Sequence, residues 1–130
     1  MKKTIITAAL TGAVTPAGYQ IPETPEQIAE SAYNCWKLAA IVHLHMRGED
    51  GYGAMNKERF RQTIKLIRSH KDCDVIINCT SSGASKAHPA TNEERMAHHK
   101  EIPGIEMGTY DAGTFNWGCI GMFENTGEFL

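Results

Sequence analysis

Short apolar runs alternate along this chain with segments whose apolar residues recur at helical spacing. The short runs are typical of buried β-strands, and the other segments are typical of amphipathic helices. An order of β-α-β-α-β-α-β predicts a parallel sheet with right-handed crossovers. We expect strands at 3–10, 41–47, 74–80 and 105–111, the last weakened by Gly108, and helices at 24–38, around Phe60, Ile64 and Ile67, and at 91–100.

Polar capping residues mark where the three helices should begin. Thr24 and Gln27 have the spacing of a capping box, in which each side chain accepts a hydrogen bond from the other residue's backbone. Thr91 and Glu94 repeat this spacing. Asn56 is a suitable N-cap for the helix between them. The three helices are therefore expected to start just after Thr24, Asn56 and Thr91.

The segments that follow the expected strands have the composition of loops. Residues 11–23 contain two glycines and two prolines, and this connection is long enough to suggest a functional loop. The tail from residue 118 to 130 has no clear period. Further loops are expected at 48–51, 81–85 and 112–117.

Polar residues gather directly after the strands, where parallel α/β folds keep their chemistry. Four strands could form a small open sheet or the first half of a (β/α)8 barrel, which typically needs about 250 residues. In a barrel these strand ends surround one mouth. This favours an α/β fold of the (β/α)8 TIM-barrel type, with this chain as its first four β/α units. The polar residues concerned are Thr11, Gly12, His43, His45, Arg47, Thr80, Ser81, Ser82, Gly83, Thr114 and Asn116.

Composition narrows the function classes. The 130 residues are enough for one domain, 1–130, with its own core. A net charge of −2 with mixed signs gives no electrostatic case for nucleic acid or an anionic membrane as partner. The four cysteines form no CxxC pair. We interpret them as reduced thiols, which indicates a cytoplasmic protein.

The first ten residues have a second interpretation. Two lysines precede an apolar run, as in a secretory signal. The run is short, contains two threonines and leads into Thr11 and Gly12, so a first strand is the better interpretation. No stretch is long enough to span a bilayer.

The expected strand at 41–47 carries two histidines two residues apart. Residues i and i+2 of a strand project from the same face, so His43 and His45 should lie together. Two adjacent imidazoles suit a single metal ion. The alternative is that one or both histidines make hydrogen bonds near the surface.

Several segments together resemble the β-keto acid cleavage enzyme family. The resemblance extends over nearly the whole chain, in order and at compatible spacing, and it concerns the N-terminal half of the family's (β/α)8 barrel. The segments are 6–13 (ITAALTGA), 24–29 (TPEQIA), 42–47 (VHLHMR), Asp50-Gly51, 77–83 (INCTSSG), Glu94-Arg95, and the stretch from Glu106-Met107 through 113–116 (GTFN).

The resemblance implies a reaction and its cofactors. Members of the family bind Zn²⁺ or another divalent metal through the two histidines, here His43 and His45, and a glutamate from the second half. With acetyl-CoA as co-substrate, a β-keto acid yields acetoacetate and a new acyl-CoA. The metal would polarise the keto group as a Lewis acid. The partners are therefore small molecules.

The resemblance also implies a set of substrate-binding residues. Thr80, Ser81, Gly83, Thr114 and Asn116 would hold the substrate carboxylate, and Arg47 and Val14 complete the set. The family's type member has a glutamate at the position of Val14, where it contacts a substrate amino group. This valine therefore indicates a substrate without a positive charge. No catalytic residue is expected here, because the general base and its arginine partner should lie beyond Leu130.

Two other functions stay open. Amidohydrolase-like hydrolases also carry two histidines in this pattern, but on the first strand of their barrel. The other alternative is a non-catalytic half-barrel fragment or binding module. A half-barrel has two open strand edges and an uncovered apolar face, so we expect a homo-oligomer.

Overall fold

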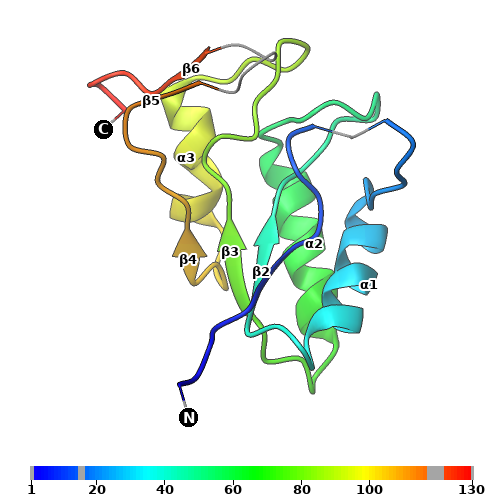
Figure 1. Cartoon of the computed structure of the whole chain (residues 1–130). Coiled ribbons are helices and arrows are strands. Elements are labelled where there is room, and N and C mark those ends of the chain that lie inside the picture. The colour runs from blue at the N-terminus through cyan, green and yellow to red at the C-terminus, as the bar shows by residue number, and fades with distance from the viewer. Residues whose placement is uncertain (1, 15–16, 117–121, 130) are drawn as a thin grey trace.

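The computed structural model describes residues 2–14, 17–116 and 122–129, and its centre is a parallel sheet of four strands. The strands lie in the order β1-β2-β3-β4 and all point the same way (Figure 1). The predicted parallel sheet is therefore confirmed. The strands are β1 (Thr7–Ala9), β2 (Ile41–Leu44), β3 (Ile76–Cys79) and β4 (Met107–Gly108).

Three helices connect these strands, and each begins where its capping residue predicts. They are α1 (Pro25–Cys35), α2 (Lys57–Ser69) and α3 (Asn92–Glu101). Capping boxes form at Thr24 and at Thr91, and the Asn56 side chain accepts from the Arg59 backbone at 3.1 Å. Each cap satisfies a backbone N–H that has no partner inside the helix. The helix at 24–38 ends earlier than expected, at Cys35, and a turn follows it.

The hydrophobic core lies between one face of the sheet and the helices. Val42 and Leu44 of β2 and Ile77 of β3 are fully buried there against α1 and α2. The residues that alternate with them project from the other face, because strand side chains alternate between faces. On that face, one row across the sheet consists of Ala9, His43, Asn78 and Met107. The arrangement is consistent with part of a TIM-like barrel.

All four strands are shorter than the sequence predicts, the outer two most of all. The strands expected at 41–47 and 74–80 extend only over Ile41–Leu44 and Ile76–Cys79. The strand expected at 3–10 pairs only over Thr7–Ala9, and Ile5 and Ile6 before it are 73% and 55% exposed. The strand expected at 105–111 pairs only at Met107 and Gly108. Each outer strand has a neighbour on one side alone among the described residues, so an apolar run there does not ensure a long ladder.

A small second sheet corrects the interpretation of the chain after residue 111. The sequence predicts a loop at 112–117, and its tail from 118 to 130 has no clear period. Instead, β5 (Thr114–Asn116) pairs antiparallel with β6 (Met122–Glu124) near the end of the main sheet toward which its strands point (Figure 1). The two strands have three residues each and are largely exposed, so no apolar alternation marks them. Trp117, the last residue of the expected loop, lies outside the described residues.

In the described part of the chain, no helix has the length and apolar character needed to cross a membrane.

Candidate metal and substrate site

His43 and His45 lie side by side at the carboxyl end of β2. His43 is inside the strand and His45 comes directly after it. Their ring centroids are 4.9 Å apart, and the ring planes meet at 77°. The expectation that the two imidazoles lie together is met, and their binding of a metal stays a prediction.

A hydrogen bond from the neighbouring strand orients His43. In the register of the sheet, His43 lies opposite Asn78 of β3, and its Nδ1 is 2.5 Å from Asn78 Oδ1. An amide oxygen only accepts, so Nδ1 of His43 must carry the proton. The lone pair of the neutral ring then lies on Nε2. A partner that fixes the tautomer in this way is typical of metal-binding histidines.

His45 has a buried ring nitrogen without a partner. No hydrogen bond reaches its Nδ1 from the described residues. Burial, with smaller contributions from His43 and Arg47, lowers the pKa of His45 to about 4, and Asp111 opposes this shift. At neutral pH the ring is therefore uncharged, and it has a lone pair to donate. A buried polar atom without a partner is costly unless a ligand uses it.

The two histidines therefore fit two positions of a metal site. Within residues 2–14, 17–116 and 122–129, no three His, Cys, Asp or Glu side chains are grouped so that they could hold a metal ion. Two imidazoles alone make an open, incomplete set for zinc, which takes four ligands in most protein sites.

The loop after β3 lies next to this pair. Thr80 and Ser81 are about 1% exposed, and the Ser82 backbone donates to Thr80 Oγ1 at 3.0 Å. The Ser81 hydroxyl donates to the carbonyl of Thr109 at 2.8 Å. These bonds hold the two hydroxyls in fixed positions at the carboxyl end of the sheet.

Gly83 brings this loop into contact with the histidines. A Cβ at this position would lie 3.3 Å from His45 Nδ1 and 3.1 Å from Met55 Sδ. The backbone N–H of Gly83 also points at the Met55 sulfur, at 3.2 Å. A side chain here would be tight against the imidazole and the Met55 sulfur, and these neighbours would have to shift to accept it.

Gly53 lies where the backbones of three loops approach one another closely. A Cβ at Gly53 would fall 2.7 Å from the carbonyl oxygen of Gly83 and 3.3 Å from that of Ala13. The loops after β1, β2 and β3 therefore touch one another through backbone atoms. This convergence puts the segment that contains Val14 beside the histidine and serine loops.

The Arg47 side chain makes its hydrogen bonds within the protein. It is 2% exposed, and its guanidinium donates to Thr11 Oγ1 at 3.2 Å and to the carbonyls of Gly12 and Gly51 at 2.6 and 2.7 Å. These bonds fix the loop after β1 against the turn after β2. The contacts give Arg47 a structural function, and its contact with substrate stays a prediction.

The remaining predicted residues are more open. Val14 is 57% exposed, and Thr114 and Asn116 are exposed positions of β5, paired with Glu124 and Met122. Thr114 and Asn116 therefore lie on the antiparallel pair of β5 and β6 and not on the expected loop.

Sequence reasoning missed two residues that contact these segments. Asp111 accepts a hydrogen bond from the Ser82 hydroxyl at 2.8 Å. Asn125 is 5% exposed and bonds to the backbone at Asp111 and Gly113. Asp111 could have been found as an acidic residue at a strand end. Asn125, in an Asn-Thr-Gly sequence, has only the signal of a turn residue.

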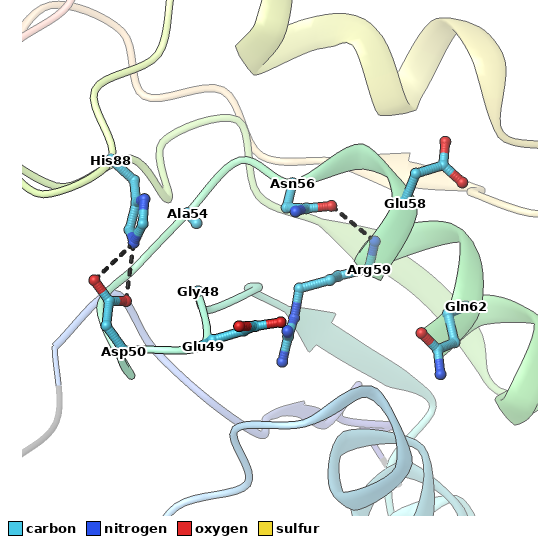
Figure 2. A pocket seen from close by; sticks show the side chains of 9 residues that line it. All are labelled: Gly48, Glu49, Asp50, Ala54, Asn56, Glu58, Arg59, Gln62 and His88. Carbon is cyan, nitrogen blue, oxygen red and sulfur yellow. Dashed lines mark hydrogen bonds and ion pairs between the residues drawn. The ribbon is translucent and has the colours of Figure 1, made fainter.

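A cavity of about 560 Å³ lies next to the turn after β2, away from the histidine pair. Figure 2 shows it between this turn, the start of α2 and His88, which is 2.9 Å from Asp50 Oδ1. Its lining combines three carboxylates with Arg59 and His88, and neither His43 nor His45 contributes. His43 thus lies on the open face of the sheet, and neither histidine of the pair lines this cavity.

Comparison with known proteins gives a consistent result. The chain is 42% identical over 129 residues to a 3-keto-5-aminohexanoate cleavage enzyme of Fusobacterium nucleatum, a match that covers 97% of this chain and 45% of the relative. It is 35% identical to a 3,5-dioxohexanoate:acetyl-CoA acetone transferase of Paraburkholderia graminis, covering 98% of this chain and 40% of that protein. A 3-dehydrocarnitine:acetyl-CoA trimethylamine transferase of Rhizobium meliloti is 34% identical over an alignment of 137 positions, which covers 89% of this chain and 45% of that protein.

The chain thus spans somewhat less than half the length of these relatives. The beta-keto acid cleavage enzyme family matches residues 3–130, nearly all of the sequence. Together with the paired histidines at the carboxyl end of β2, this match shows that the chain belongs to the β-keto acid cleavage enzyme family.

Proposed function

We propose that this chain is the metal-binding part of an enzyme that converts a β-keto acid and acetyl-CoA into acetoacetate and a new acyl-CoA. Family membership supports the reaction class, and two relatives carry acetyl-CoA in their names. The observation that carries the proposal is the histidine pair: the proton of His43 is fixed by Asn78, and His45 has a buried nitrogen without a partner.

We propose that residues 1–130 form one domain, the N-terminal half of a (β/α)8 barrel. The helix-free face of the sheet supports this, since it carries the paired histidines and the exposed side chain of Met107. In a barrel that face would be the interior. Its exposure also supports association with a further half-barrel or a second copy. A cytoplasmic location is a separate part of the proposal.

His43 and His45 would hold a divalent metal, with zinc as the first candidate. When bound, the metal would polarise the keto oxygen of the substrate. The residues of this chain would then orient the two histidine rings toward the metal. Asn78 holds the His43 ring, and Gly83 leaves room beside His45 for the ring and its ligand.

The substrate carboxylate would lie against the loop after β3. The groups that would meet it there are the hydroxyls of Thr80 and Ser81 and the backbone N–H of Gly83. In the free protein these groups bond to Ser82, to the carbonyl of Thr109 and to the Met55 sulfur, so a carboxylate would replace those partners. Thr114 and Asn116 on β5 would close the site from the side. Val14 and Arg47 complete this set. Arg47 would act by holding the loop that carries Val14, since its buried guanidinium donates hydrogen bonds to Thr11 and Gly12 of that loop.

Zinc binding tests the proposal directly. Zinc affinity and stoichiometry would be measured for the wild-type chain, His43→Ala and His45→Ala, with His88→Ala as control. His88 is bonded to Asp50, away from the pair. We expect each ligand substitution to weaken binding at least about tenfold, because one imidazole then holds the ion alone. Equal binding by all four proteins would remove the histidine pair from the proposed function.

A further inference from the structure

Helix α3 is tied to the two segments of the proposed carboxylate site through one buried arginine. Arg95 is 9% exposed. Its Nε donates to the carbonyl of Ser81 at 2.7 Å, and its terminal nitrogen donates to Asn125 Oδ1 at 2.6 Å. Phe129 covers the guanidinium, with its ring centroid 3.6 Å away. This geometry leaves Arg95 as an internal connector and not as a ligand of substrate.

Asn125 carries the connection from Arg95 to the segment before β5. Its Nδ2 donates to the carbonyl of Asp111 at 2.5 Å, and its backbone N–H donates to the carbonyl of Gly113 at 3.1 Å. One residue thereby fixes both ends of residues 111–113, which lead directly into Thr114. With its oxygen accepting from Arg95, the amide of Asn125 is used at both its donor and acceptor ends.

Asp111 completes the link on the other side. Its carboxylate accepts from the hydroxyl of Ser82 at 2.8 Å, and this hydroxyl is 3.3 Å from Thr80 Oγ1. The chain of contacts therefore runs from α3 through Asn125 and Asp111 into the loop after β3. It returns to α3 through Ser81 and Arg95. The two bonds of Arg95 are buried and the others are partly buried. A closed set of hydrogen bonds of this kind is rigid when every member is satisfied.

We propose that Arg95 and Asn125 are positioning residues that hold the loop after β3 and the start of β5 at a fixed separation, so that both contact one substrate carboxylate. The proposal rests on the proposed function, because it presupposes that these two segments bind the same group. Neither residue touches the substrate. Their effect is on how well Gly83 and Asn116 are placed before binding, and pre-placed donors avoid an ordering cost when the ligand binds.

The test measures binding of acetoacetate, the smallest β-keto acid that the reaction involves, to the zinc-loaded chain. Backbone amide resonances of Gly83 and Asn116 are followed by NMR during the titration. In the wild type we expect both resonances to shift with one common dissociation constant. Asn125→Ala should raise that constant about tenfold, because the start of β5 loses its fixed distance from the loop.

Asn125→Asp separates positioning from folding. It has the same size and keeps an acceptor for Arg95, but it has no N–H to offer the carbonyl of Asp111. We expect Asn125→Asp to lose as much affinity for acetoacetate as Asn125→Ala, although the hydrogen bond from Arg95 to residue 125 is kept. Tyr33→Phe is the control: it removes the 3.1 Å bond to Asp72, outside the set of contacts from Ser81 to Asn125, and should lower stability without changing the dissociation constant.

The outcomes distinguish the two proposals. If acetoacetate shifts neither resonance in the wild type, the carboxylate site itself is wrong, and the positioning role falls with it. If both resonances shift but the two Asn125 variants bind as tightly as the wild type, the site stands and the positioning role is overturned. Weaker binding by both variants, with Tyr33→Phe unchanged, supports it.

Discussion

A valine at position 14 gives the loop after β1 an apolar side chain beside the proposed substrate site. Arg47 donates to Thr11 and Gly12 of this loop, and Gly53 lets its backbone approach Ala13, so the residues just before Val14 are fixed against the neighbouring loops. A carboxylate at this position would attract an ammonium group of a substrate through a charge-assisted hydrogen bond. Valine provides only apolar contact, which favours a neutral substrate tail.

We predict that Val14→Glu shifts specificity toward an amino-substituted β-keto acid. In a polypeptide of the relatives' full length that carries this sequence, kcat/KM for the ammonium substrate relative to its neutral isostere should rise about tenfold. The effect stays moderate because Val14 is 57% exposed and solvent screens the charge. Tyr19→Glu is the control, since it adds the same charge at an exposed position of the same loop. A wild-type preference for the ammonium substrate would contradict this role of Val14.

Individual site residues could be predicted where the sequence itself contains the spacing. The pairing of His43 with His45 follows from the alternation of a strand, and the structure places the rings together. The contact of His43 with Asn78 depends on the register of β2 against β3, which no local pattern gives. The same holds for Asn125, whose partners on α3 and before β5 are distant in sequence.

Helix α3 packs on the rest of the molecule through a histidine. His98 is fully buried, stacks on Phe60 of α2 with ring centroids 4.2 Å apart, and lies 2.9 Å from the carbonyl oxygen of Thr80 through Nε2. The carbonyl accepts, so Nε2 carries the proton of the neutral ring. Burial, with a smaller contribution from His99, lowers the pKa of His98 to about 4, against a weaker opposing effect of the bond to Thr80.

This burial makes stability depend on pH. The pKa of His98 is about 4 in the folded state and near 6.5 when unfolded, so the unfolded chain binds more protons between these values. The free energy of unfolding should therefore fall as the pH decreases through this window, by up to about 1.4 kcal/mol per pH unit for this histidine. Denaturant titrations between pH 5 and 7 would measure it.

His98→Gln should reduce that dependence. Glutamine keeps an N–H for the carbonyl of Thr80 and does not titrate. Ile28→Val is the control, because it removes a buried methyl group from the core face of α1 and should lower stability equally at every pH. If wild type and His98→Gln show the same slope against pH, the slope comes from other groups.

Elements with local signals were predicted better than elements without them. The three helix starts are confirmed at the capping residues, because a cap is a contact between residues three positions apart. The hairpin of β5 and β6 was missed, because its strands are short and bury little apolar area. The lengths of β1 and β4 were wrong because their pairing depends on a neighbour and not on their own composition.

At the scale of the whole molecule, the described residues provide two imidazoles, those of His43 and His45, for the proposed metal site, and one face of the sheet is left open. The relatives are about twice as long as this chain. We predict that the 130-residue chain, supplied with zinc, acetyl-CoA and a neutral β-keto acid, forms no acetoacetate, because two ligands leave the metal shell incomplete and the described site contains no assigned general base. Formation of acetoacetate would be measured against a polypeptide of the relatives' full length that carries this sequence. Turnover by the shorter chain would refute the prediction.

The register of the sheet has a consequence for how the molecule reaches its structure. Ile41 pairs with both Thr7 and Ile76, and Asn78 pairs with Met107, so each strand meets a partner only about 30 to 35 residues away along the chain. Within the described four-stranded sheet, no strand pairing requires residues near the two ends of the chain to meet first. Each crossover therefore closes a loop of similar length at a similar entropic cost, and the sheet can grow one unit at a time from any pair already formed.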